Sequence, residues 1–334
     1  MRGTTVRQNS TNVRPTIQAA RAAVHAIAPA SSALAARVAM EVFVRPRRHR
    51  TPSREQAALA GARFERVPFG DAHLPAWTWG DREQPAVLLV HGWEGRGAQL
   101  ATFVPALRAA GFRVVAFDGP GHGQSPLQRS SAAHMALAIE RMAQACGPFA
   151  GVVAHSVGGA ATALALRFAR GSLDLGRCVL LAPPVSAERF FDGFCRALEL
   201  DDAMRAAVAR RIESELGVSV DAIDVRACTP WLGAPMLLLH DQGDREVAFE
   251  NARTFVSAWP GAKLVVTSGL GHRAILRDPD VIAATAAFVA GKDDVATGLP
   301  FGSIERDLFD RSRRWTHAPG EDRDADTRIR THRH

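Results

Sequence analysis

The fold of this chain is decided by the stretch Val152-Val153-Ala154-His155-Ser156-Val157-Gly158-Gly159. Its first half is rich in β-branched residues, which is typical of a buried strand, and the Ala- and Leu-rich run over residues 160–169 is typical of a helix. A serine therefore lies at the corner where a strand turns directly into a helix. Glycine follows that corner twice, where strand and helix come too close together for a larger side chain.

Outside this corner, short apolar strands alternate with helical segments. Such alternation predicts an α/β fold in which helices cover both faces of a mostly parallel sheet. Eight strands are expected, at residues 63–68, 74–80, 86–90, 112–117, 151–155, 177–181, 235–240 and 262–266. The helices of the two layers are expected at residues 98–110, 131–146, 157–170, 247–258 and 278–289. Ligands bind at the carboxyl ends of the strands in sheets of this kind, which is where Ser156 lies.

The composition of the chain divides it into three parts. Residues 1–54 are a basic arm with an Ala-rich helical segment that Pro29 interrupts. Residues 55–292 are the α/β domain, and an insertion at 184–232 within it is predicted to form a small helical lid. Residues 293–334 mix Gly, Pro, Arg and Asp, and we expect them to be disordered.

Positive charge is concentrated in the arm. The whole chain has a net charge of +7, but residues 1–54 contain ten arginines and a single acid, Glu41, so the remainder is slightly negative. A folded domain without clustered positive charge is not expected to bind nucleic acid. A weak peripheral contact between residues 16–50 and an anionic membrane is one interpretation of the arm. A helix packed on the body of the protein, or a loose arm, is the alternative.

The four cysteines are widely spaced and lack C-x-x-C spacing. This pattern predicts buried thiols in a reducing cytoplasm and argues against a disulfide framework or a zinc site.

Three residues with chemically useful side chains follow predicted strands. The surroundings of Ser156 fit the pattern G-x-S-x-G, except that Ala154 stands in place of the first glycine. Asp244 lies in a G-D-x-x-V sequence after the strand at 235–240, and His272 lies in a G-x-G-H sequence after the last strand. A hydroxyl becomes a good nucleophile when a base takes its proton, and the base needs an acid to hold its tautomer.

Two more turns complete the pattern. His91-Gly92-Trp93 directly follows the strand at 86–90, and a glycine-rich turn over residues 118–125 follows the next strand. Taken together in this chain order, the five turns resemble those of the α/β-hydrolase family, and within it the esterase/lipase-like serine hydrolases with an H-G-W oxyanion turn. The resemblance covers residues 63–290.

The resemblance implies a role for each matching residue. Ser156 would be the nucleophile, His272 the general base and Asp244 the acid that holds the histidine. The backbone N–H groups of Trp93 and Val157 would form the oxyanion hole. We therefore expect hydrolysis of a carboxylic ester or thioester through an acyl-enzyme.

Two other functions remain open from the sequence. The same triad would serve an acyltransferase, and an idle member of the fold would bind a small ligand or a partner without catalysis. Asp241 and Glu246 are rival candidates for the acid, but Asp244 is in register with the motif.

The expected partner is a small-molecule substrate, bound in part by the insertion. Its apolar residues at helical spacing, which we expect to line the acyl site, are Phe190, Phe191, Phe194 and Leu198. They predict uncharged, apolar acyl groups of short to medium length. No cofactor or metal is expected, because three separate turns account for the histidines at 91, 122 and 155.

Overall fold

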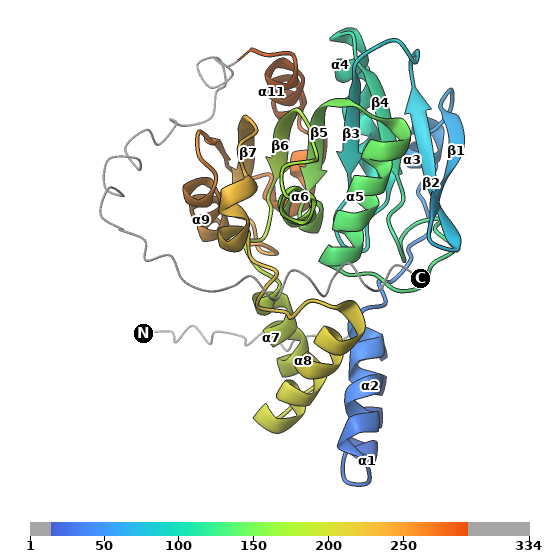
Figure 1. Ribbon diagram of the computed structural model, residues 1–334, viewed down its shortest axis with the longest axis vertical. Coiled ribbons are helices and arrows are strands. Elements are labelled where there is room, and N and C mark those ends of the chain that lie inside the picture. The colour runs from blue at the N-terminus through green and yellow to red at the C-terminus, as the bar shows by residue number, and fades with distance from the viewer. Residues whose placement is uncertain (1–14, 293–334) are drawn as a thin grey trace, which may run out of the picture.

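The computed structural model describes residues 15–292, and an eight-stranded sheet of order β1-β2-β4-β3-β5-β6-β7-β8 lies at its centre (Figure 1). Strand β2 is antiparallel to its neighbours β1 and β4, and every other pair is parallel. The strands are β1 Arg63–Phe69, β2 Ala72–Trp79, β3 Ala86–Val90, β4 Arg113–Phe117, β5 Phe149–His155, β6 Arg177–Leu181, β7 Met236–Asp241 and β8 Lys263–Thr267. The predicted fold class is confirmed.

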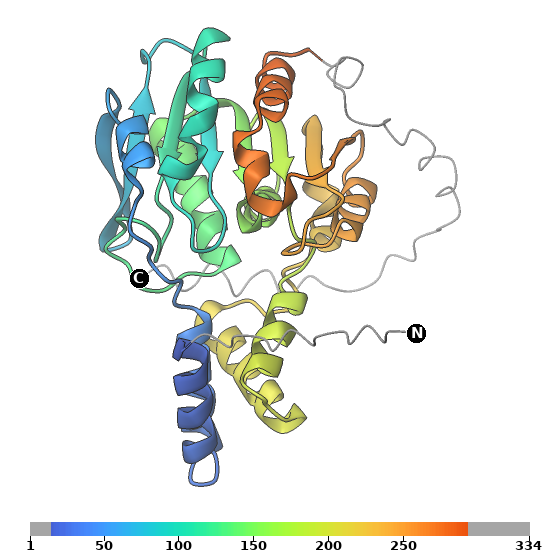
Figure 2. The same ribbon diagram turned by 180° about the vertical axis from the view of Figure 1, so that it is seen from behind.

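Helices cover both faces of the sheet (Figures 1 and 2). On one face lie α5 Ala132–Cys146, α6 Val157–Ala169 and α9 Glu250–Ala258. The other face is covered by the 3-10 segment η1 Gly97–Phe103 with α4 Val104–Ala109, and by α11 Pro279–Val289. Every residue of β3 and β7 is buried as a result, which explains why β3 is a continuous apolar run and β7 is apolar up to His240.

Two predicted helices differ in detail. The segment expected at 98–110 is divided at Val104, because Pro105 at the start of α4 has no N–H for a preceding turn. The segment expected from residue 247 begins at Glu250, since the preceding residues form the loop that holds Asp244.

Four helices form a cap beside the carboxyl edge of the sheet (Figure 1). They are α1 Pro15–Ile27, α2 Ser32–Phe43, α7 Glu188–Ala197 and α8 Asp202–Leu216. Ser31 caps α2 by accepting a hydrogen bond from the Leu34 amide, and Asp201 caps α8 in the same way. Met40, Phe191 and Val208 are fully buried in the shared core of the cap.

Of the interpretations of residues 1–54, a helix packed on the body of the protein is the one that α1 and α2 show. Helices α1 and α2 supply half of the cap, because the apolar face of the insertion helices needs a second apolar face to cover it. The expected lid is therefore built from two distant parts of the sequence. The disorder predicted for residues 293–334 lies outside the described residues, as do residues 1–14.

The basic segment after α2 is bound to the body of the protein. Arg47 pairs with Glu94, and the guanidinium of Arg48 donates hydrogen bonds to the carbonyls of Gly121 and Leu127. Contact between residues 16–50 and a membrane stays a prediction. Within residues 15–292 no helix combines the length and apolarity needed to span a bilayer.

Candidate active site

Ser156 lies at the corner between β5 and α6, in a strained backbone conformation. Its φ of 53° and ψ of −127° are unusual for a residue with a side chain, and such outliers cost about 1–3 kcal/mol. The corner is tight, since a Cβ on Gly158 would lie 2.6 Å from the His91 carbonyl oxygen. Ala154, which stands in place of the first glycine of G-x-S-x-G, is a fully buried strand residue that pairs with Val90.

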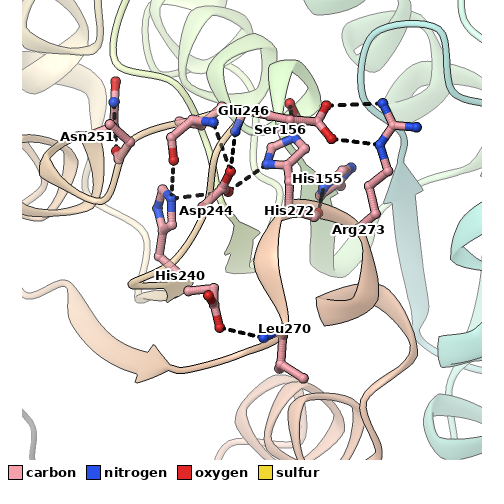
Figure 3. Close-up of polar contacts among 12 residues, drawn as sticks. His155, Ser156, His240, Asp244, Glu246, Asn251, Leu270, His272 and Arg273 are labelled. Carbon is pink, nitrogen blue, oxygen red and sulfur yellow. Dashed lines mark hydrogen bonds and ion pairs between the residues drawn. The ribbon is translucent and has the colours of Figure 1, made fainter. Parts of the chain in front are cut away.

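The three predicted chemical side chains are in contact (Figure 3). The Oγ of Ser156 lies 3.0 Å from Nε2 of His272, and Nδ1 of His272 lies 2.7 Å from Oδ2 of Asp244. All three residues are buried. If Nδ1–H donates to the carboxylate, Nε2 is left free to accept the serine proton.

Asp244 is held as a carboxylate by its loop. Its Oδ1 accepts hydrogen bonds from the amides of Glu246 at 2.8 Å and Val247 at 2.9 Å. Burial raises the pKa of Asp244, but hydrogen bonds from His240 and His272 outweigh it, so the pKa is well below its usual value. The side chain therefore remains charged and can stabilise an imidazolium.

Asp241, the rival acid, has a different position. It accepts hydrogen bonds from the Leu270 amide at 2.9 Å and the Thr267 hydroxyl at 3.0 Å. These contacts tie the end of β7 to the loop that carries His272. Although burial opposes the effect, the amides of Leu270 and Gly243 lower the pKa of Asp241.

Two further histidines, His155 and His240, bind the backbone of the segments that carry His272 and Asp244. Nε2–H of His155 donates to the carbonyl oxygen of His272 at 2.9 Å, and Nε2–H of His240 donates to the carbonyl oxygen of Val247 at 2.9 Å. Burial lowers the pKa of His155 to about 3, so it remains neutral and keeps its role as a donor. No pattern in the sequence predicted either contact.

The predicted oxyanion residues flank the serine. Val157 directly follows Ser156 at the start of α6, and Trp93 lies in the turn after β3. Gly92 brings that turn close, since a Cβ at this position would lie 2.9 Å from Cβ of Ser156. Both Trp93 and Val157 line the main cavity, which lies between the cap and the sheet. A group bound in that cavity would therefore contact these two residues.

An ion pair that the sequence did not reveal lies beside Trp93. Arg47 binds Glu94 with two hydrogen bonds, from Nε at 2.9 Å and Nη2 at 2.8 Å. Glu94 has a φ of 57°, in the left-handed region that residues with a Cβ rarely adopt. Burial raises the pKa of Glu94, but the hydrogen bonds and the charge of Arg47 have the larger effect, so the pKa is below its usual value. The pair is therefore ionised near neutral pH.

The four apolar residues predicted to line the site are divided by the structure. Phe190 and Phe194 line the main cavity, whereas Phe191 and Leu198 do not. Phe191 and Leu198 are buried among the cap helices, where Phe191 packs edge-on against Phe43 at 5.7 Å between ring centroids. The reason is helical geometry, because residues four or seven positions apart share one face of a helix. Phe190 and Phe194 therefore lie on one face of α7, and Phe191 and Leu198 lie on the adjacent face.

The histidines at 91, 122 and 155 are engaged in hydrogen bonds with separate backbone groups. Nδ1–H of His91 donates to the Gly92 carbonyl, and Nδ1–H of His122 donates to the Pro120 carbonyl. Within residues 15–292, no group of three potential ligands is arranged to hold a metal ion. The four cysteines, all within the described residues, are buried thiols that form no disulfide there.

Comparison with known proteins agrees with this architecture. The profile of a family described as "Alpha/beta hydrolase family" matches residues 87–285. Among curated proteins, none matches the chain.

Several solved structures are similar. The thioesterase domain from the curacin biosynthetic pathway is 21% identical with a TM-score of 0.50, over 68% of this chain and 99% of that chain. A serine hydrolase from the polyaromatic hydrocarbon-degrading bacterium Cycloclasticus zankles is 20% identical with a TM-score of 0.53, over 70% and 100%. A membrane phospholipase A, described as a bacterial virulence factor, is 19% identical with a TM-score of 0.55, over 84% and 97%. At these identities the likeness shows the fold alone.

Proposed function

The chain belongs to the alpha/beta hydrolase family, and from the geometry of its site we propose that it is a serine hydrolase that cleaves a carboxylic ester or thioester. The observation that carries this proposal is the chain of two hydrogen bonds from Ser156 through His272 to Asp244. A scaffold that only bound a ligand would need neither these side chains in contact nor a strained serine between them.

The first step forms an acyl-enzyme. Nε2 of His272 takes the proton of Ser156 as Oγ attacks the acyl carbonyl carbon, and the imidazolium then protonates the leaving oxygen or sulfur. Asp244 stabilises the imidazolium through its bond to Nδ1. In the second step His272 takes a proton from water, which attacks the acyl carbon. The imidazolium then returns this proton to Oγ of Ser156 as the bond between Oγ and the acyl carbon breaks and the acid leaves.

The negative charge on the carbonyl oxygen needs hydrogen-bond donors during both steps. The amides of Trp93 and Val157 are the proposed donors, because they flank Ser156 on the side of the cavity. Removing one such donor typically costs about 10²–10³ in kcat.

Labelling with a fluorophosphonate probe tests the proposal without assuming a substrate. We expect the wild type and a Ser257→Ala control, altered at an exposed serine, to be labelled and to hydrolyse p-nitrophenyl acetate. Ser156→Ala should remain folded, lose labelling and lose at least ~10³-fold in turnover. Unchanged turnover in that variant would overturn the assignment.

A further inference from the structure

A cavity of about 640 Å³ lies between the cap and the carboxyl edge of the sheet. Trp93 and Val157 line it, and so do residues from all four cap helices. A volume of this size is typical of sites that enclose a small organic ligand. The cavity therefore continues directly from the proposed oxyanion hole into the cap.

The wall that α2 provides is apolar. Leu34, Val38 and Val42 all line the cavity, and their spacing of four residues places them on one face of the helix. Leu34 is 49% exposed, so this end of the wall is open to solvent. Phe194 of α7 and Ile212 of α8 also line the cavity.

The charged residues at the cavity are neutralised by one another or lie in solvent. Glu41 pairs with Arg45 at 3.2 Å, and Arg47 pairs with Glu94. Arg37 also lines the cavity, but it is exposed. A carboxylate buried in the apolar part would therefore lack a partner, which makes its burial costly.

We propose that the substrate carries a medium-chain, uncharged acyl group, and that α2 is the wall against which the chain lies. This inference rests on the proposed hydrolysis at Ser156, because the acyl carbon must lie at Oγ of Ser156 with its carbonyl oxygen toward the amides of Trp93 and Val157. Each methylene that enters the cavity is worth ~0.8 kcal/mol, which is about fourfold in kcat/KM. The N-terminal helices are thus a determinant of specificity in a site otherwise formed by residues 93–223.

The test uses the full chain and p-nitrophenyl esters of acetate, butyrate, octanoate and hemisuberate. We expect kcat/KM to rise from butyrate to octanoate by between about 10-fold and 200-fold, depending on how completely the four added methylenes are buried. Val38→Trp fills the cavity from α2 and should lower octanoate turnover at least about 10-fold more than it lowers acetate turnover. Ala33→Trp, which adds the same side chain on the exposed face of α2, should match the wild type.

Should Val38→Trp fail to fold, as shown by loss of fluorophosphonate labelling, Val38→Thr replaces it, since threonine has a similar shape and adds a hydroxyl to the cavity. It should lower octanoate turnover selectively by several-fold. If acetate is hydrolysed but turnover does not rise with chain length, the inference is wrong and the proposed function stands. Preference for hemisuberate over octanoate would also overturn it, because Arg37 would then bind an anionic end. Loss of both labelling and acetate hydrolysis in the wild type would instead overturn the proposed function.

Discussion

Replacing Arg47 with glutamine would remove the two hydrogen bonds that hold Glu94 next to the proposed oxyanion residue Trp93. Glu94 adopts a left-handed conformation, which costs roughly 1–2 kcal/mol for a residue with a Cβ, so the turn needs an external contact to keep its shape. Because the segment after α2 supplies that contact, Arg47 is a positioning residue for the amide of Trp93.

The size of the effect follows from the exposure of the pair. Hydrogen bonds to charged groups contribute about 1.5–3 kcal/mol when well shielded. Here the two side chains are 35% and 23% exposed, so solvent screening reduces the value for the whole pair to about 1–2 kcal/mol. If this energy is realised mainly in the transition state, kcat should fall about 5- to 30-fold.

The assay is hydrolysis of p-nitrophenyl acetate, whose acyl group is too short to depend on the cap. We expect Arg47→Gln to lower kcat and leave KM nearly unchanged, and Arg47→Lys to restore part of the loss because it keeps the charge without the planar fork. The matched control is Arg45→Gln, which removes an arginine that pairs with Glu41 on α2. A double variant with Glu94→Gln should be no worse than either single variant. The reasoning is refuted if Arg47→Gln and Arg45→Gln have the same kcat, or if only KM changes.

Two further predictions concern the acids and the buried histidines. Asp244→Asn should lower kcat roughly 10³- to 10⁴-fold, whereas Asp241→Asn should mainly lower Tm, and steady-state kinetics with thermal melts would expose a wrong choice of acid if the order were reversed. Burial lowers the pKa of His122 to about 4, below its unfolded value of 6.5, so its stabilising contribution is present above pH 6.5 and is lost as the pH falls toward 4. Burial raises the pKa of Asp118 to about 6, which acts in the opposite direction but is present in every variant. His122→Gln should therefore reduce the loss of stability between pH 6.5 and 5 by about 2 kcal/mol. The control His49→Gln, at an exposed histidine, should not reduce this loss. Denaturant melts at both pH values measure this, and equal losses in both variants would contradict it.

The sequence by itself determined the sheet and the contact between Asp244 and His272. Most of the parallel strands are largely apolar runs buried on both faces, so each is recognisable without knowing its neighbours, and the connections restrict their order. Parallel strands bring their carboxyl ends to one edge, which explains how residues 156, 244 and 272 could be placed together from their positions after strands. Asp244 is preferred to Asp241 because it is in register with the G-D-x-x-V motif that the resemblance supplies. The structure adds that the amides after Asp244 bind its carboxylate.

The cap was decided only by the tertiary structure. An apolar stripe shows that a helix face is covered but does not identify what covers it, so the segment containing α2 and the insertion could not be paired from sequence. For the same reason Phe191 could not be told from Phe190, since adjacent faces of α7 are both apolar and one meets the cap core while the other meets the cavity. The ion pair between Arg47 and Glu94 joins two charged residues, of a kind usually found at the surface, from segments far apart in the sequence. It depends on how α2 is placed over the sheet, and no local propensity encodes that placement.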